Sequence, residues 1–195
     1  MSADILRILH AAETAAHWHV AQRRKGEAQE PYINHLLEVA RLVGEATGGA
    51  DANLVIAALL HDAIEDCEIS PVTIETAFGA DVRALVEAVT DDKSLPKATR
   101  KQLQIDHAPG QVQRAKLLKL ADKTSNLRAM AASPPANWPV ARRLEYVAWA
   151  RAVVAGLRGA HAGLEAMFDA AAAKAEAAAG GDGDVAMRLG GSPSA

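Results

Sequence analysis

The most constraining feature of this chain is a run of seven apolar residues, 54–60, that ends directly at a cluster of titratable groups. The run, LVIAALL, is apolar on every side, so its pattern alone fits either a buried strand or a buried helix. Its length and the capping residue Asp51 ahead of it favour a helix, which we expect to continue to residue 64. The sequence therefore predicts a helix enclosed on all sides at the centre of the fold.

The remainder of the chain also follows the helical period. Apolar residues at three- and four-residue steps predict helices over residues 3–24, 32–47, 81–89, 111–131 and 137–157. Capping and breaking residues predict two more over 71–79 and 97–107, and alanine propensity predicts a last helix from 161 to about 179. We find no strand pattern and no internal repeat, so we expect an all-α bundle of about eight to ten helices.

The length of 195 residues suits a single domain, since a typical domain has roughly 150 residues. Hydrophobic residues make up 50% and charged residues 23% of the chain, which is the composition of a globular protein. We expect one domain over residues 1–179. Residues 180–195, GGDGDVAMRLGGSPSA, have too little apolar content to be held against it, so we expect a disordered tail there.

Charge and cysteine content exclude several classes of protein. The chain has 21 Lys and Arg against 24 Asp and Glu, so it lacks the basic excess that nucleic-acid binding requires. The single cysteine, Cys67, excludes an internal disulfide and fits a reducing compartment. No uncharged apolar segment approaches the ~18 residues of a membrane span, and residues 1–13 carry acids, unlike a signal peptide. We therefore expect a cytoplasmic protein with no nucleic-acid or membrane partner.

Four titratable side chains follow the apolar run, namely His61, Asp62, Glu65 and Asp66. On a continuous helix, His61 and Glu65 would share one face and the two aspartates the adjacent one. Burying these groups without partners would be costly. A divalent cation bound by His61 and Asp62 would remove that cost and leave Glu65 and Asp66 as acids beside it. A solvated helix end is the alternative that this segment alone leaves open.

Residues on two other predicted helices extend this pattern. His35 lies on an otherwise apolar helix face, and Asp122 lies between apolar residues with Asn126 one turn beyond it. A lone histidine or aspartate in such a place is more often a core residue with satisfied hydrogen bonds. The combined pattern H…HD…D, formed by His35, His61, Asp62 and Asp122, is far more specific and favours a metal site.

Further motifs accompany this pattern in order along the chain. They are RRKG (23–26), PYINH (31–35), AALLHDAIED (57–66), FGADV (78–82), VTDDK (89–93), KLADKTSNLR (119–128), NW (137–138), RRLEY (142–146) and WA (149–150). The H…HD…D pattern resembles the HD superfamily of metal-dependent phosphohydrolases. The motifs together resemble the hydrolase domain of the RelA/SpoT family, and most closely its stand-alone small alarmone hydrolases, relatives of the metazoan SpoT homologue. The resemblance runs from about residue 4 to residue 164.

The resemblance implies an HD-domain helical bundle that binds one Mn²⁺. The ligands would be the residues that match the family's, namely His35, His61, Asp62 and Asp122. Mixed imidazole and carboxylate ligands suit Mn²⁺ better than Mg²⁺, which favours oxygen alone. Glu65 and Asp66 match the family's acid pair, which takes a proton from the attacking water.

The resemblance also implies a set of substrate contacts. Arg24 would stack on a purine, and Lys25, Lys97, Asn126 and Arg142 would contact phosphate or ribose. Tyr146 would lie near the nucleotide. For Lys97, Arg142 and Tyr146, an ordinary solvated or structural role is an equal alternative. We expect Trp138 and Trp149 to be packing residues, Cys67 to be incidental, and the remaining histidines to be surface or structural residues: His10, His17, His19, His107 and His161.

The function implied is hydrolysis of the 3′-pyrophosphate of the alarmone (p)ppGpp to GDP or GTP and pyrophosphate. Removal of the 2′-phosphate of NADPH and hydrolysis of an adenosine-type alarmone are alternatives, because stacking on Arg24 accepts any purine. A catalytically silent nucleotide-binding module is a third alternative. The presence of all four candidate ligands and both acids argues against it. The partner is in each case a purine nucleotide, and pairing with a second copy of the chain stays open.

Overall fold

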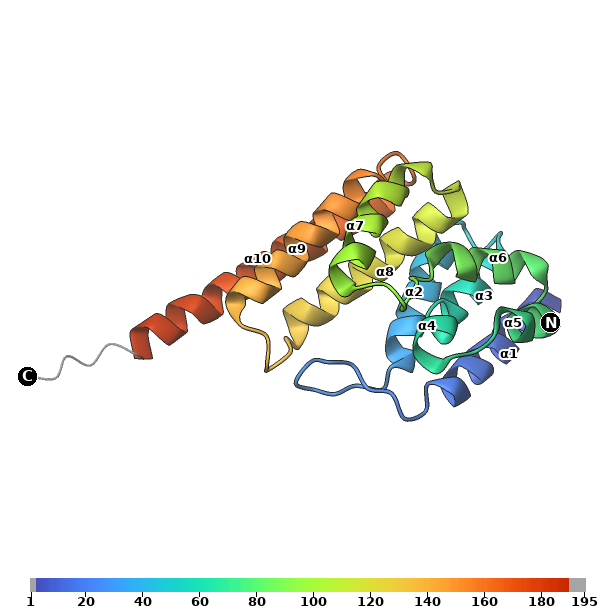
Figure 1. Ribbon diagram of the computed structural model, residues 1–195, viewed down its shortest axis with the longest axis horizontal. Coiled ribbons are helices and arrows are strands. Elements are labelled where there is room, and N and C mark those ends of the chain that lie inside the picture. Colours follow the sequence, from blue (N-terminus) through green and yellow to red (C-terminus); the bar gives the residue numbers. More distant parts are fainter. Residues whose placement is uncertain (1–2, 190–195) are drawn as a thin grey trace, which may run out of the picture.

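The computed structural model describes residues 3–189, with side chains as far as residue 181. Within these residues the fold is all-α, with ten α-helices, one short 3₁₀ helix and no strand, as predicted (Figure 1). The elements are α1 (Ala3–Trp18), α2 (Ile33–Ala46), α3 (Ala52–Leu60), α4 (Ala63–Cys67), α5 (Pro71–Phe78), α6 (Ala80–Val89), α7 (Lys97–His107), η1 (Ala108–Gly110), α8 (Gln113–Ala132), α9 (Val140–Ala155) and α10 (Ala162–Leu189).

Helix α3 is the central helix that the apolar run predicted. It contacts α1, α2, α6 and α8, and its side chains from Leu54 to Leu60 are almost all buried. Asp51 caps its start, because the backbone N–H of Leu54 donates to Asp51 Oδ1 at 3.0 Å. Arg114 of α8 binds the same carboxylate, with Nε 2.7 Å from Oδ2. The centre of the bundle is thereby tied to the helix that carries Asp122.

The central helix ends four residues earlier than we expected. It stops at Leu60, and a separate short helix, α4, begins at Ala63. Between them His61 keeps helical angles, whereas Asp62 has φ −98° and ψ 0°, which turns the chain out of the helix. The predicted helix to residue 64 is therefore wrong. Its break lies at the two residues that the sequence singled out as metal ligands.

Helix α1 also ends early, at Trp18 instead of residue 24. The polar segment that follows has no apolar face to bury, and it pairs with the chain just before α2. The N–H of Arg24 donates to Glu30 O at 2.9 Å, and the N–H of Tyr32 donates to Gln22 O at 3.1 Å. The first candidate substrate residues therefore lie on a loop that folds back toward the start of α2.

Helix α10 extends to Leu189, ten residues beyond the expected end. Alanine is the strongest helix former, and each glycine costs only about 1 kcal/mol in a helix, so the propensity carries through Gly180 and Gly181. The domain boundary at residue 179 and the disordered tail over 180–195 stay predictions, since residues 190–195 lie outside the described part. Among the described residues, no helix is both long and apolar enough to cross a membrane.

Candidate functional site

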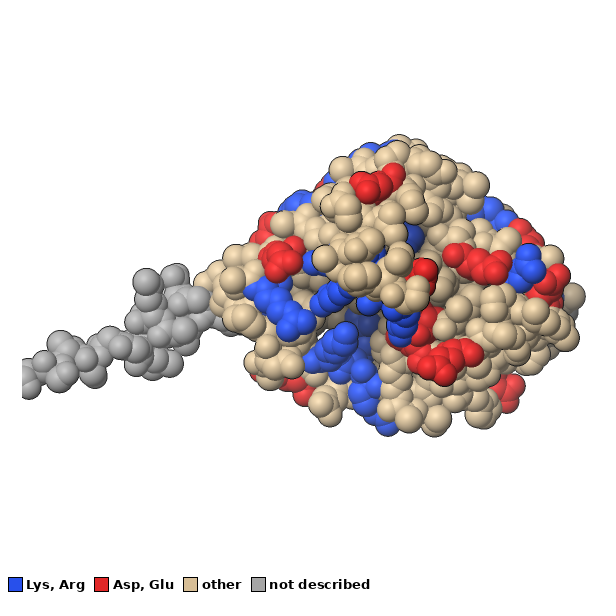
Figure 2. All heavy atoms as spheres, viewed as in Figure 1, with Lys and Arg blue, Asp and Glu red and all other residues tan. Residues whose placement is uncertain are grey.

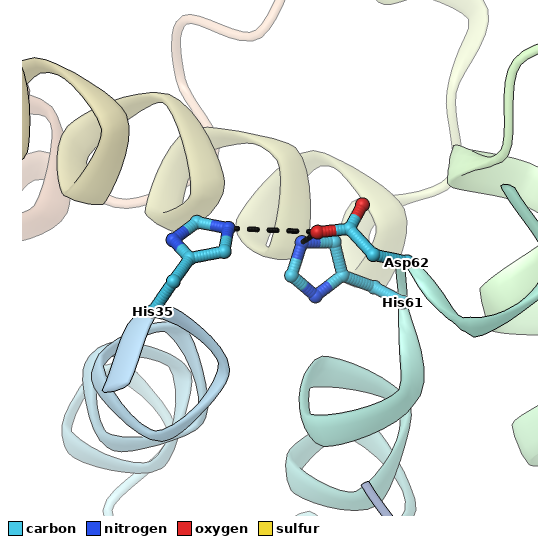
Figure 3. A group of neighbouring side chains, drawn as sticks. All are labelled: His35, His61 and Asp62. Atoms are coloured by element: carbon cyan, nitrogen blue, oxygen red, sulfur yellow. Dashed lines mark ion pairs between the residues drawn. The ribbon is translucent and has the colours of Figure 1, made fainter. Parts of the chain in front are cut away.

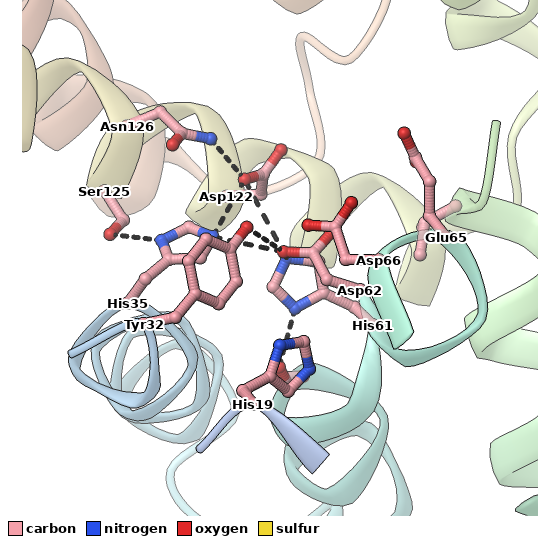
Figure 4. A network of polar contacts seen from close by, with 12 residues as sticks. His19, Tyr32, His35, His61, Asp62, Glu65, Asp66, Asp122, Ser125 and Asn126 are labelled. Carbon is pink, nitrogen blue, oxygen red and sulfur yellow. Dashed lines mark hydrogen bonds and ion pairs between the residues drawn. The ribbon is translucent and has the colours of Figure 1, made fainter. Parts of the chain in front are cut away.

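Four side chains from separate parts of the chain meet between α2, α8 and the junction of α3 with α4 (Figure 4). His35 comes from α2, His61 and Asp62 from the junction, and Asp122 from α8. One ligating atom each from His35, His61 and Asp62 lies within 4.8 Å of the other two (Figure 3). Asp122 Oδ1 is 3.4 Å from Nε2 of His35 and 3.9 Å from Nε2 of His61. The four predicted metal ligands thus converge on one point.

The two histidines are arranged to offer lone pairs to a cation. Their Nε2 atoms are buried, and neither has a hydrogen-bond partner within the described residues. Their Nδ1 atoms are engaged: His61 donates to Ala58 O at 2.8 Å, and His35 to Oγ of Ser125 at 2.9 Å. Ser125 in turn donates to Glu38. A hydrogen bond at Nδ1 leaves Nε2 free to bind a metal, so this donor set fits a divalent cation.

The charges around this point are strongly coupled. Burial lowers the pKa of His35. Burial acts the same way on His61, but the negative charges of the nearby Asp62 and Asp122 carboxylates outweigh it and raise the pKa of His61 to about 10. Burial would raise the pKa of Asp62, yet the charge of His61 holds it well below its usual range. A positive charge between the carboxylates is therefore strongly favoured.

Each of the two carboxylates is held by further donors. The Tyr32 hydroxyl donates to Asp62 Oδ2 at 2.7 Å, and Asn126 Nδ2 donates to Asp122 Oδ1 at 2.5 Å. Lys123 Nζ is 3.1 Å from Asp122 Oδ2. The i, i+4 relation of Asn126 to Asp122 was predicted, and it places the amide on the metal-facing side of α8.

Glu65 and Asp66 lie on α4 and line the same polar cavity of about 220 Å³ as His61, Asp62 and Asp122. We had expected them to share a continuous helix with His61 and Asp62. They do not, because the helix breaks at Asp62. Figure 4 shows Glu65 extending away from the two histidines. Its Oε1 is 3.4 Å from Arg100 NH1. Burial, followed by the charge of Asp91, raises the pKa of Glu65.

The predicted substrate residues surround two hollows beside this cavity. Arg24, Lys25, Asn126 and Tyr146 line one of about 210 Å³, and Lys25 and Tyr146 also line a broad groove of about 1080 Å³ with Lys97 and Arg142. Figure 2 shows lysine and arginine side chains gathered around this hollow, with acidic side chains along one edge. All six predicted substrate residues therefore line these two hollows, and two of them, Lys25 and Asn126, also line the cavity of the candidate metal ligands.

Arg24 sits where the loop after α1 meets α8. Its NH2 donates to Asn126 Oδ1 at 2.8 Å, and its guanidinium lies 5.4 Å from the centre of the Tyr32 ring. Because Asn126 also donates to Asp122, the guanidinium is linked to a candidate metal ligand through one amide. Arg24 thus lines the smaller hollow, and its partner Asn126 lines both that hollow and the metal cavity.

A model of the HD domain matches residues 11–152, which is most of the chain. The chain belongs to the HD-domain family. This HD-domain protein is 50% identical over 169 residues to guanosine-3′,5′-bis(diphosphate) 3′-pyrophosphohydrolase MESH1 of Xenopus tropicalis, covering 87% of this chain and 94% of that protein. It is 47% identical to the Homo sapiens MESH1 over 165 residues, covering 85% and 92% of the two chains.

Solved structures support the same relationship. The fold matches the structure of a metazoan orthologue of SpoT, described as hydrolysing ppGpp, with a TM-score of 0.82 and 43% identity over 88% of this chain and 94% of that one. A protein from Listeria monocytogenes matches with a TM-score of 0.61 and 28% identity, over 74% and 97% of the two chains. The resemblance of this HD-domain protein to RelA/SpoT-type hydrolases is thus confirmed.

One wall of the groove in this HD-domain protein is helix α7. None of its residues, all of which are described, is buried, yet it carries Lys97, Arg100 and Lys101 to the groove. Polar contacts hold it: Arg100 binds Glu65, and the Trp149 indole N–H donates to Lys101 O at 3.0 Å. Trp149 therefore does more than pack, because it fastens α7 to α9.

The opposite wall is a row of three aromatic rings on and beside α9. The rings of Trp138 and Tyr146 are 5.8 Å apart, and those of Tyr146 and Trp149 are 5.3 Å apart. Cations lie over two of them, with Arg142 4.3 Å from the centre of Trp138 and Lys123 4.6 Å from that of Trp149. The groove therefore offers both positive charge and aromatic surface.

Several residues of the HD-domain site were not found from the sequence. Tyr32, Ser125 and Lys123 all contact a candidate ligand or its partner, and a sequence signal existed for each because they lie within the PYINH and KLADKTSNLR motifs. His19, which we assigned to a surface or structural role, is buried at 3% exposure. Glu38 and Arg100 carried no distinguishing signal.

Proposed function

We propose that this HD-domain protein hydrolyses the 3′-pyrophosphate of (p)ppGpp, with Mn²⁺, to GDP or GTP and pyrophosphate. The observation that carries the proposal is the pair of buried Nε2 atoms without a hydrogen-bond partner among the described residues, facing two carboxylates beside a groove lined with cations. The high identity to relatives named for this reaction supports the choice of substrate. Mixed nitrogen and oxygen donors support Mn²⁺ over Mg²⁺.

His35, His61, Asp62 and Asp122 are the proposed ligands. Their own contacts hold them in place: Ser125 and the backbone of Ala58 orient the imidazoles, and hydroxyl and amide donors fix the carboxylates. What a divalent cation supplies at such a site is Lewis-acid chemistry, which polarises a phosphoryl group and acidifies a water molecule. The protein's part is to keep four ligand atoms in position before substrate arrives.

Glu65 and Asp66 are the proposed proton acceptors. Hydrolysis adds water across the bond between phosphorus and the 3′-oxygen, so the attacking water loses a proton and the 3′-oxygen gains one. Both carboxylates line the cavity that holds the candidate ligands, and burial raises the pKa of Glu65. Either acid is therefore placed to hold that proton before it passes to the leaving oxygen.

The cations of the groove are the proposed contacts for the remaining phosphates. Lys25 lines the metal cavity as well as both hollows, so it is placed to span the reacting and the distal phosphates. Lys97 and Arg142 lie farther out in the broad groove. Arg24 faces the smaller hollow, where Tyr146 supplies aromatic surface for the base.

We expect guanosine tetraphosphate to be hydrolysed with a kcat/KM at least about tenfold above that for NADPH in the presence of Mn²⁺. A 3′-pyrophosphate and a 5′-diphosphate offer four phosphoryl groups to the cations of the groove. NADPH offers three, and the group to be removed from it is a 2′-monoester, whereas (p)ppGpp loses a pyrophosphate, which is the better leaving group. Anion-exchange analysis of products, with both nucleotides and an adenosine-type alarmone assayed in parallel, measures the difference. An equal or higher value for NADPH or the adenosine alarmone would replace the proposed substrate.

Replacing Arg24 with alanine should raise KM for guanosine tetraphosphate about tenfold, since a desolvated cation–π contact is worth about 1–2 kcal/mol. Stacking accepts any purine, so binding of NADPH should weaken by a similar factor. Steady-state kinetics with both nucleotides checks this expectation. Arg41→Ala is the matched control, because Arg41 is exposed on α2, lies outside the hollows and forms its ion pair with Glu45. A KM unchanged from wild type would remove Arg24 from the base site.

A further inference from the structure

A row of polar contacts between the end of α1 and α4 has no part in the mechanism above. It begins at His19, passes through Gln22 and ends at Asp66, one of the two proposed proton acceptors. His19 is only 3% exposed, so its ring nitrogens depend on protein partners. The row therefore reaches from a buried imidazole to the edge of the metal cavity.

The hydrogen bonds in this row have a defined direction. His19 Nδ1 lies 2.5 Å from Oε1 of Gln22, and since an amide oxygen can only accept, the imidazole donates. The amide nitrogen of Gln22 then faces Asp66 and donates to its Oδ2 at 2.8 Å. A reversed amide would set two acceptors against each other at Asp66. His19 and Asp66 therefore favour the same orientation of the Gln22 amide, and His19 fixes its oxygen end.

His19 is itself held on two sides. Its ring stacks on Tyr32, with centroids 5.2 Å apart and planes at 17°, and Cys67 Sγ lies 3.5 Å from its Nε2. Tyr32 is the residue whose hydroxyl donates to Asp62. The His19 ring thus packs against a residue that is hydrogen-bonded to a candidate metal ligand, which connects this row of contacts to the metal cavity.

Asp66 lies between two donors of different kinds. Lys93 Nζ is 3.0 Å from its Oδ1, and Gln22 binds its Oδ2. The Lys93 side chain is half exposed, comes from the segment between α6 and α7, and donates to the backbone carbonyl of Glu65 as well as to Asp66. Gln22 is the donor with a buried support behind it.

We propose that Gln22, oriented by His19, is a positioning residue that holds the Asp66 carboxylate in place for proton transfer. The inference rests on the proposed function, because it takes Asp66 as a proton acceptor. The Gln22 side chain also lines the smaller hollow, but its two hydrogen bonds run to His19 and Asp66. It acts on the reaction through Asp66, so its loss should lower kcat much more than it changes KM.

The kinetic test uses the whole protein with Mn²⁺ and guanosine tetraphosphate. Gln22→Leu removes the donor at similar volume and should lower kcat about tenfold while KM changes by less than about twofold. Gln102→Leu is the matched control, since the Gln102 amide donates to the exposed Asp106 at 2.8 Å, and it should keep wild-type kinetics. An unchanged kcat in Gln22→Leu would overturn the inference.

Rescue by a conservative variant separates positioning from packing. His19→Asn keeps an N–H donor near the place of Nδ1 and should retain most of the kcat that His19→Leu loses. His17→Asn serves as the control, because His17 is exposed and its Nδ1 bonds only to the backbone of Glu13. Equal losses in His19→Asn and His19→Leu would assign His19 to packing alone and overturn its role in orienting Gln22.

A readout without substrate distinguishes this inference from the proposed function. In ¹⁵N-histidine-labelled protein, the His19 signal, assigned by its loss in His19→Asn, should show a protonated Nδ1 whose shift changes in Gln22→Leu but not in Gln102→Leu. If the His19 shift changes as expected but the wild type hydrolyses none of the nucleotides, the proposed function is wrong, and so is the positioning role that depends on it. If the wild type is active and the His19 shift ignores Gln22→Leu, the inference alone is wrong.

Discussion

Replacing Asp122 with alanine should abolish hydrolysis of guanosine tetraphosphate while the helical fold survives. Asp122 is the ligand that α8 contributes, and without it two imidazoles and one carboxylate remain. Residues that merely orient a metal ligand are worth about 10–100-fold in affinity or activity, so the loss of a ligand should exceed that range. Asp122 also balances the buried charge of Lys123, which deepens the effect.

Calorimetric titration with Mn²⁺ and circular dichroism on the same sample check this expectation. The titration should show one bound ion in the wild type and strongly weakened binding in Asp122→Ala. The helical circular-dichroism signal should be the same for both proteins. Asp106→Ala on the exposed face of α7 is the matched control and should bind the ion normally. Normal turnover in Asp122→Ala, or in wild-type protein stripped of metal, would show that the site has been misassigned.

The double replacement of Glu65 with glutamine and Asp66 with asparagine should lower kcat at least about 10²-fold with the ion still bound. Both substitutions preserve shape and remove the proton acceptors, and a general base contributes roughly 10²–10⁴-fold. The single variants should differ, since Asp66 is fixed by Gln22 and Lys93 while Glu65 is engaged by Arg100. Their individual losses identify the acid that takes the proton.

Single-turnover assays on the double variant, with Mn²⁺ content measured on the same sample, provide the test. Glu68→Gln is the control, because Glu68 follows α4 and is exposed. Full activity in a double variant that demonstrably holds the ion would remove both acids from the mechanism. Loss of the ion together with activity would assign them instead to metal binding.

Most of the bundle could be predicted because its helices carry local signals. Asp51 was recognised as a cap and accepts the expected backbone hydrogen bond, and Ser70 accepts the equivalent bond at the start of α5. The apolar run of α3 is buried on all sides, as its composition required. Helix ends were less predictable, because α1 stops where the chain finds backbone partners at Glu30 and Tyr32, which lie outside the helix.

The break at Asp62 shows why the geometry of the site was beyond the sequence. Neighbouring side chains on a continuous helix point in directions about 100° apart, so His61 and Asp62 would not meet at one point. The turn at Asp62 brings its Oδ2 to 3.1 Å from Nε2 of His61. The residue types predicted the chemistry, but only the tertiary fold determines the angle at which they meet.

Residues that support the site through long-range contacts were equally hidden. Ser125 receives the His35 hydrogen bond across ninety positions of sequence separation, and Glu38 then accepts from Ser125. Neither contact follows from local spacing, because each depends on how α2 packs against α8. Arg24 and Asn126 illustrate the same point, since they were predicted separately and the structure joins them.

Helix α7 makes the shape of the groove sensitive to ionic strength. Its contact to α4 is a charge pair, Arg100 with Glu65, and its cations Lys97 and Lys101 face Arg142 across the groove. Added salt screens such contacts, with a Debye length near 10 Å at 0.1 M. No side chain of α7 is fully buried, although the partly buried Ile105 packs against the core, so the helix is held in part by these polar contacts. A nucleotide rich in phosphate would lie between the like charges of α7 and α9. Its phosphates would then act as the counterion that holds α7 beside α9.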